Sequence, residues 1–348
     1  MSNNFNTDFS PNHSFLEYCK NCLLDMIKYA DEKHLSNESF SIPVENEEVL
    51  KEYCNLNNTD RQKWLLENGH EAAVYNFYYK HLFFSLVVDF SNYYIASIEQ
   101  AFNGNINVAW ALLRKPLQET LAYLEWLYVD KVELVKLMLE SEKVEEYEIV
   151  KKRFEEKRAS NIHKIQSDDV SAIIDMYDFR YSYTEEFSLN GMLQATNHLI
   201  TTRPNLKTSP SGLNFVFMDG EIYKRNVGFY YTSIPYVMFY TMDVITKIFI
   251  DIAKLGEYTV SINKYNLALK NLYAAHTSFD KVKTLLNSDE MYLFCSRCGK
   301  KHNSDLDWIK FTQNRFRCRR CFKKLNTNTM IFDFEDVRRD REAESTKE

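Results

Sequence analysis

Glycine and proline are scarce in this chain, which has 8 and 6 of them among its 348 residues. Both fractions lie well below the average usage of roughly 7% and 5%. Such a composition argues against glycine-rich nucleotide-binding folds and against β-sandwiches with many tight turns. The chain also lacks the motifs GxxxxGK[ST], GxGxxG, HExxH and GxSxG and an EF-hand loop, so ATPase, Rossmann dehydrogenase, zincin and α/β-hydrolase functions lose support.

The sequence has little that favours export or a membrane. Residues 1–11 are polar and contain no apolar core after a basic stretch, so we expect no signal peptide. The most apolar window, 229–250, contains Pro235, Asp243 and Lys247, and charges are costly in lipid, so we predict a buried core helix there. Four of the seven cysteines form two CxxC pairs in one short region near the C-terminus, which favours a reduced cytoplasmic protein over a disulfide framework.

Apolar side chains are plentiful enough to build a core, at 45% hydrophobic and 15% aromatic residues. They recur at helical spacing, which predicts a mainly α fold built as a helical bundle. Ser14 and Glu17 predict a capping box at the first helix, and Pro116 predicts a kink or a late helix start. The predicted helices span residues 14–34, 47–56, 60–67, 72–102, 107–128, 131–163, 169–177, 185–200, 234–254 and 261–287.

One segment of the predicted bundle has strand character instead. Residues 213–224 contain Asp219-Gly220, a dipeptide typical of two-residue turns, so we predict a small β-hairpin there. The resulting organisation is N-terminal helices over 1–69, the bundle over 70–290, a C-terminal module over 291–334 and a charged tail over 335–348.

The formal net charge of −6 is unevenly distributed along the chain. Residues 1–290 carry a net charge of −11, and residues 332–348 carry −3. Between them, residues 291–331 hold ten Lys or Arg and only two Asp, a net charge of +8. A basic module is therefore fused to an acidic body.

The basic module contains two CxxC pairs, Cys295 with Cys298 and Cys318 with Cys321, and 19 residues separate the pairs. Two such pairs can place four thiolates around one Zn²⁺ ion. The segment resembles the zinc-ribbon family over about 40 residues. This resemblance implies a structural zinc ion, because four protein thiolates close the coordination shell and leave no open position for catalysis.

The residues after the two pairs differ. Gly299 follows the first pair, where a positive φ lets backbone N–H groups point at the thiolates, whereas Phe322 follows the second and departs from that pattern. We expect strands at 292–294 and 330–334 and a small hairpin around 312–314.

The positive charge of the module has three interpretations. The basic residues can bind the phosphates of RNA or DNA, with Trp308, Phe311 or Phe316 stacking a base. Alternatively, the module can dock on the acidic body or on a partner subunit. A third interpretation is a solvated surface whose charges stabilise the thiolates. We favour nucleic acid, and the candidate contact residues are Arg297, Lys300, Lys301, Lys310, Arg315, Arg317, Arg319, Arg320, Lys323 and Lys324.

A second functional hypothesis comes from Arg158 and His163, which fit an RxxxxH pattern. The chain resembles the HEPN class of metal-independent ribonucleases, which use such a pair inside a helical bundle. The resemblance implies that His163 acts as general acid or base and that Arg158 stabilises charge on the phosphate, with two pairs meeting in a homodimer. It also implies a role in bacterial toxin or anti-phage defence. The alternative is a charged helix end with a solvated histidine.

Other polar residues carry simpler interpretations. Arg114 and Glu119 border an apolar helix face, where they form either a buried ion pair that fixes helix register or part of a polar pocket. His198 either joins His163 at a site or ends a helix. Cys19 and Cys22 form a third CxxC inside an amphipathic helix, and we interpret them as core cysteines rather than redox or metal-binding ones.

Overall fold

The computed structural model describes residues 9–36, 47–167, 174–185, 188–202, 207–208, 210, 213–214, 220–274, 292–295, 300–303, 317–324 and 329–332. The fold is mainly helical, as predicted, with one two-stranded antiparallel sheet among these residues. The helices are α1 (Ser10–Glu32), α2 (Glu47–Asn55), α3 (Asn58–Glu67), α4 (Glu71–Phe102), α5 (Ile106–Lys115), α6 (Leu121–Val129), α7 (Lys131–Glu140), α8 (Glu155–Ser167), α9 (Met176–Tyr181), α10 (Leu189–Ala195), α11 (Gly220–Ala253) and α12 (Glu257–Ala274), and the strands are β1 (Tyr292–Phe294) and β2 (Lys301–Asn303).

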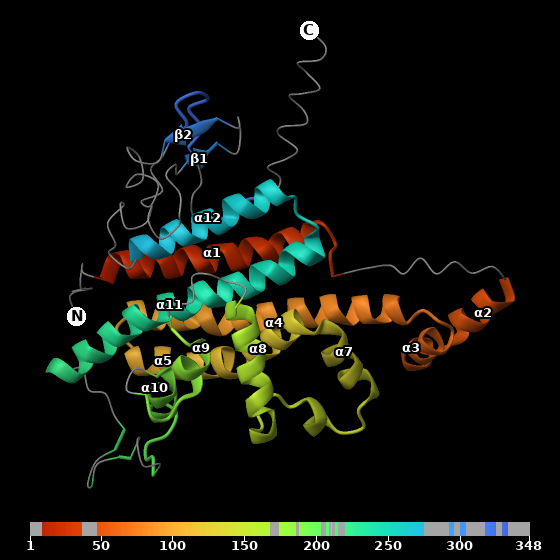
Figure 1. Cartoon of the computed structure of the whole chain (residues 1–348), viewed down its shortest axis with the longest axis horizontal. Coiled ribbons are helices and arrows are strands. Elements are labelled where there is room, and N and C mark those ends of the chain that lie inside the picture. The colour runs from red at the N-terminus through yellow and green to blue at the C-terminus, as the bar shows by residue number, and fades with distance from the viewer. Residues whose placement is uncertain are drawn as a thin grey trace.

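Four long helices form the centre of the molecule. Figure 1 shows α12, α1, α11 and α4 lying side by side, with α5 and α10 on the far side of α4 and the β1–β2 sheet beyond α12. Helix α1 packs against α4, α11 and α12, so it lies at the middle of the bundle. Its apolar residues recur three or four positions apart and are fully buried, because that spacing puts them on one face: Phe15, Leu16, Cys19, Leu23 and Met26.

The first helix begins earlier than the capping-box prediction placed it. Helix α1 starts at Ser10, its N-cap residue Phe9 makes no side-chain capping bond, and Pro11 occupies the first turn. Proline has a fixed φ near the helical value and lacks the N–H that a first turn leaves unpaired, so it starts the helix without a cap. The prediction that Ser14 caps this helix is therefore wrong.

The hairpin predicted over 213–224 is also wrong in its second half. Gly220 has the positive φ that a turn requires, at 63°, but residues 220–224 form the first turn of α11. Helix α11 contains the apolar window 229–250, which is mostly buried, as predicted. Among the described residues, no helix combines the length and apolarity that crossing a bilayer requires.

Two other predicted helices are interrupted. Pro116 opens a π-helical turn over Pro116–Thr120 between α5 and α6, so the helix is irregular at the position where proline predicted a kink or a late helix start. The charge-rich stretch 131–163 is divided into α7, two short 3₁₀ turns and α8.

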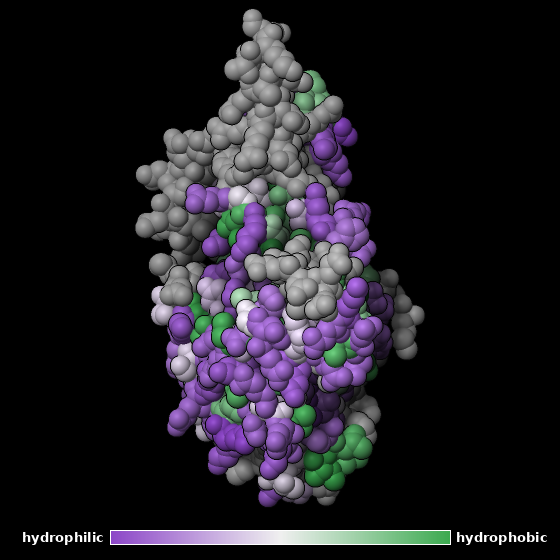
Figure 2. Space-filling model, turned by 90° about the vertical axis from the view of Figure 1, so that its right-hand side faces the viewer, coloured by the Kyte–Doolittle hydropathy of each residue, from purple (hydrophilic) through white to green (hydrophobic). Residues whose placement is uncertain are grey.

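On the face seen in Figure 2 the described surface is mostly hydrophilic, and its apolar side chains form small separate groups.

A short C-terminal segment, residues 329–332, docks on the bundle. The side chain of Asn263 in α12 donates to the carbonyl of Ile331 (2.6 Å) and accepts from its N–H (2.9 Å). The ring of Phe332 stacks on Tyr29 of α1, with 4.3 Å between ring centroids. Residues 330–332 are therefore held by helices, and they do not form the strand that the sequence predicted there.

A pH-dependent ion pair joins α7 to α11. Asp251 accepts hydrogen bonds from Lys131 (2.7 Å), Lys254 (3.0 Å) and Tyr79 (3.1 Å). Partial burial raises the pKa of Asp251, but these hydrogen bonds outweigh it and lower the pKa from 3.8 to about 2. A depressed carboxyl pKa stabilises the folded state above pH 4, and this contribution disappears as the pH falls toward 2.

We expect Asp251→Asn to lower the free energy of unfolding at pH 7 by at most about 1 kcal/mol, because both ion-pair partners are partly exposed. The difference from the unmodified protein should shrink as the pH falls from 4 toward 2. Urea unfolding at a series of pH values measures it, with Asp31→Asn at an exposed position of α1 as the control. A deficit that stays constant across this range would contradict the assignment.

Candidate metal centre and its basic surface

The first CxxC sequence lies between two paired strands. In the sheet, Phe294 of β1 is opposite Lys301 of β2. The backbone N–H of Cys295 donates to the carbonyl of Lys300 at 3.0 Å. Cys295 is therefore fixed at the start of the turn that connects the strands. Cys298 lies outside the described residues.

The second CxxC sequence has the same register. Arg317 forms an antiparallel bridge with Lys324, and the N–H of Cys318 donates to the carbonyl of Lys323 at 2.9 Å. In both turns the residue before the first cysteine pairs with the residue seven positions later, and the cysteine N–H bonds to the carbonyl five positions later. The same backbone pairing therefore frames the first cysteine of each CxxC sequence.

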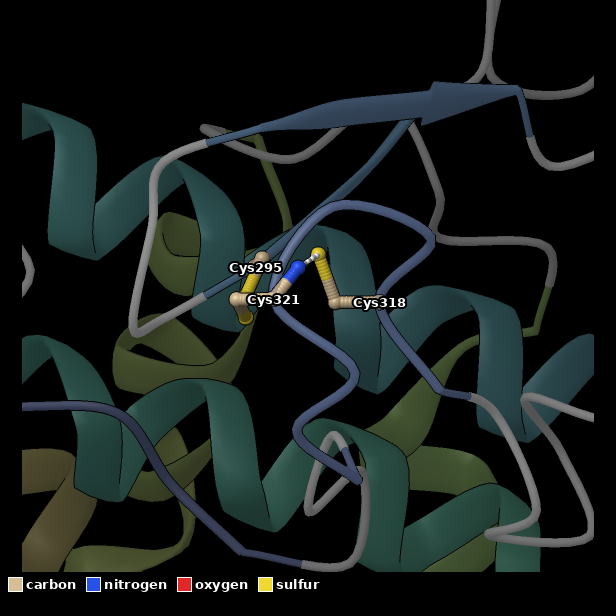
Figure 3. Close-up of side chains that lie close together, drawn as sticks. All are labelled: Cys295, Cys318 and Cys321. Carbon is tan, nitrogen blue, oxygen red and sulfur yellow. Dashed lines mark hydrogen bonds between the residues drawn. The ribbon is translucent and has the colours of Figure 1, made fainter.

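Three cysteine sulfurs from the two turns converge. The sulfurs of Cys295, Cys318 and Cys321 all lie within 4.8 Å of one another, and those of Cys295 and Cys321 are 3.5 Å apart (Figure 3). Cys295 and Cys318 are buried, and none of the three forms a disulfide. Thiolates bound tetrahedrally at about 2.3 Å from a zinc ion are roughly 3.8 Å apart, so the arrangement can hold a metal ion.

Donor groups surround one of these sulfurs. The backbone N–H groups of Arg320 and Cys321 point at the Sγ atom of Cys318, at 3.3 and 3.5 Å. The buried side chain of His302, on β2, places Nε2 at 3.3 Å from the same sulfur. The two backbone N–H donors stabilise a thiolate, which is the form of cysteine that binds metal, and His302 adds a third donor in the tautomer that carries its proton on Nε2. The sequence analysis did not identify His302, because a single histidine outside the CxxC pairs has no diagnostic spacing.

The described basic residues of the module lie on its surface. Lys300, Arg317, Arg319, Arg320, Lys323 and Lys324 are all exposed. Within the described part of the chain, Arg317, Arg320, Lys323 and Lys324 form no ion pair with an acidic side chain. The side chains of the other predicted contact residues lie outside the described residues, as do the rings of the predicted stacking residues: Arg297, Lys301, Lys310, Arg315, Trp308, Phe311 and Phe316.

The structure separates the two residues of the RxxxxH pattern. Arg158 is buried, and its guanidinium donates to the carbonyls of Ile149 (2.5 Å) and Lys151 (3.1 Å). Five positions along a helix correspond to a rotation of about 140° away from the starting face. His163 accordingly faces solvent, with its Nε2 atom 3.0 Å from Asp175.

No shared cleft joins this pair in the described part of the single chain. A nearby open hollow is lined by Lys152, Arg153, Glu155, Glu156, Ala159 and Tyr177, and by neither Arg158 nor His163. The ribonuclease hypothesis therefore stays a prediction without geometric support from one chain. His198 is exposed and makes no described contact with His163.

Of the two alternatives for Arg114 and Glu119, the buried ion pair is not formed among the described residues. Glu119 is exposed, and no described ion pair joins it to Arg114. Instead, Glu125 of α6 pairs with Arg180 of α9, and both side chains are only 1% exposed. Tyr240 of α11 donates to the same carboxylate at 2.9 Å. This buried pair was missed because its partners are far apart in the sequence.

The π-helical turn supplies the other partner of Arg180. The N–H of Leu121 bonds to the carbonyl of Pro116, so the Leu117 carbonyl does not receive the α-helical hydrogen bond from Leu121. Arg180 donates to it through Nε (2.9 Å) and Nη2 (2.5 Å). Burial raises the pKa of Glu125 even though the facing Arg180 charge opposes it. With both side chains enclosed, the pair can fix α6, α9 and α11 but cannot meet a solvent-borne substrate.

The third CxxC is part of the core, as predicted. Cys19 and Cys22 are buried in α1, and burial raises the pKa of both thiols, that of Cys22 to about 12. At neutral pH they are protonated and therefore poor metal ligands or redox nucleophiles.

Comparisons with family models, curated proteins and solved structures found no match to this chain.

Proposed function

We propose that the C-terminal module is a zinc ribbon in which Cys295, Cys298, Cys318 and Cys321 hold one structural Zn²⁺ ion. Two observations support this: three of the four sulfurs converge, and the same backbone pairing frames the first cysteine of each pair. Zinc supplies a fixed point for a module too small to have a core of its own. With four thiolates the site is closed, so the ion holds the module together and performs no chemistry.

We further propose that this module binds nucleic acid in the cytoplasm through its exposed cations. The observation that carries the proposal is that Arg317, Arg320, Lys323 and Lys324 are exposed and have no acidic partner among the described residues. Docking on the acidic body requires such partners, so the described contacts favour an external polyanion. Phosphate contacts of this kind release counterions and make binding steeply dependent on salt.

The test is a charge-reversed variant, Arg317→Glu with Arg320→Glu and Lys323→Glu. We expect it to weaken binding of RNA or DNA oligonucleotides by roughly tenfold or more. The plot of log K against log salt should also become less steep, with the magnitude of its negative slope reduced by about 2. Fluorescence anisotropy at several salt concentrations gives both values.

The matched control reverses three exposed lysines of the body, Lys51, Lys164 and Lys207, and so has the same net charge. We expect this control to bind nearly as well as the unmodified protein, because its changes lie outside the module. If both variants bind the oligonucleotides equally weakly, the effect comes from the net charge of the protein and not from the module. Unchanged binding by the module variant would refute the proposal. If only a protein partner is lost, the docking alternative holds.

A further inference from the structure

An exposed aromatic ring projects from the second cysteine turn. Phe322 is 73% exposed, the largest exposure of any large apolar side chain among the described residues. Its ring makes no aromatic contact within the described part of the chain. Burying such a ring in the core would stabilise the fold by roughly 1.5–3 kcal/mol, and here that gain is not made. The side chain therefore contributes little to the packing of the protein.

The backbone at this position is also unfavourable for phenylalanine. Phe322 has φ = 58°, in the left-handed region, which costs an ordinary residue about 1–2 kcal/mol. The corresponding position after the first CxxC pair is Gly299, the residue best suited to a positive φ. Folding alone thus favours glycine at position 322, and the strain is held by the turn, where the N–H of Phe322 donates to the Cys318 carbonyl at 2.9 Å.

Several exposed cationic residues are close neighbours of Phe322 in the sequence. Arg320 precedes Phe322 by two positions, and Lys323 and Lys324 follow it, all of them exposed. Proteins that bind single-stranded nucleic acid without reading its sequence combine aromatic rings, on which bases stack, with cations that bind the phosphates. Bases of a duplex are already stacked on each other, so a ring can reach their faces only by unstacking them, which costs a few kcal/mol per step.

We propose that Phe322 stacks on an unpaired base and that the ligand of the module is therefore single-stranded nucleic acid. This inference rests on the proposed nucleic-acid binding and adds the class of ligand to it. The cations supply affinity for any polynucleotide, and the ring supplies the preference for strands whose bases are free. The turn holds the ring away from the protein, where a base can reach its face.

The test compares Phe322→Gly and Phe322→Trp with the unmodified protein. The probes are a 20-nucleotide oligo(dT), an oligo(U) of the same length and a 20-base-pair duplex, followed by anisotropy at one salt concentration. We expect the glycine variant to bind both single strands about 5- to 150-fold less tightly, the range given by one lost base stack, and to bind the duplex unchanged. The tryptophan variant should keep the preference for single strands.

The controls separate this inference from the broader proposal. Zinc content should be equal in all three proteins, and the glycine variant should be no less stable, because it relieves the strained φ. If the charge-reversed variant loses binding but Phe322→Gly binds single strands normally, or loses single strands and duplex equally, the stacking inference fails and nucleic-acid binding stands. If the unmodified protein binds none of the three probes, both proposals fail.

Discussion

Replacing Arg180 by Met will destabilise the helical bundle by about 3–5 kcal/mol, one of the two largest effects expected of this protein. The variant leaves the carboxylate of Glu125 buried at 1% exposure without its counter-charge, and it leaves the Leu117 carbonyl without its donor. Tyr240 supplies only one remaining hydrogen bond to Glu125. Urea unfolding at pH 7, followed by far-UV circular dichroism, measures the loss.

Two further variants isolate the cause. The double variant Glu125→Leu with Arg180→Met removes both charges, and we expect it to recover most of the lost stability, because a buried ion pair is often no better than an apolar pair. Lys115→Met breaks an exposed pair with Asp89 and should change stability by less than about 1 kcal/mol. A stability within 1 kcal/mol of the unmodified protein for Arg180→Met would mean that water or another group replaces the pair.

The sequence could not reveal this pair because two physical features hide it. Glu125 and Arg180 lie 55 positions apart, so no local spacing connects them. A π-helical turn also holds an extra residue, so the α-helical period that points to Arg114 and Glu119 no longer applies after Pro116. Proline predicted the irregularity correctly, but the number of residues that the irregular turn would hold depends on packing against α9.

Sequence patterns of a few neighbouring residues predicted more of the structure than this distant pair did, although packing against the rest of the chain changed some of what they predicted. Asp219-Gly220 predicts a hairpin turn, and Gly220 has the positive φ that a turn requires, yet the chain continues into α11 because the apolar residues that follow are buried in the bundle. The turn around Cys318 and Cys321 is likewise local, so the CxxC spacing was enough to find sulfurs that converge. His302 reaches this cluster only through the pairing of β2 with β1, which the cysteine spacing does not show.

Removing the proposed zinc ion is expected to unfold the cysteine module while leaving the helices intact. The free energy of structural zinc binding is about 10–16 kcal/mol in small domains, and a segment of about 40 residues is usually too short to fold stably without such an ion. The docked segment 329–332 should stay in place, because Asn263 and Tyr29 hold it through contacts that involve no cysteine. Treatment with a chelator should therefore leave the far-UV helical signal nearly unchanged.

Hydrogen exchange distinguishes the two regions after chelation. We expect the amide of Cys318, which bonds within the module, to lose its protection, and the amide of Ile331, which bonds to Asn263, to keep it. Cys318→Ser should bind no zinc and give the same pattern without chelator. Cys54→Ser, at an exposed cysteine of α2, is the matched control and should keep one zinc ion per chain. If Cys318→Ser also loses helical signal or protection at Ile331, the module and the bundle fold as one cooperative unit, and the zinc ion stabilises the whole chain.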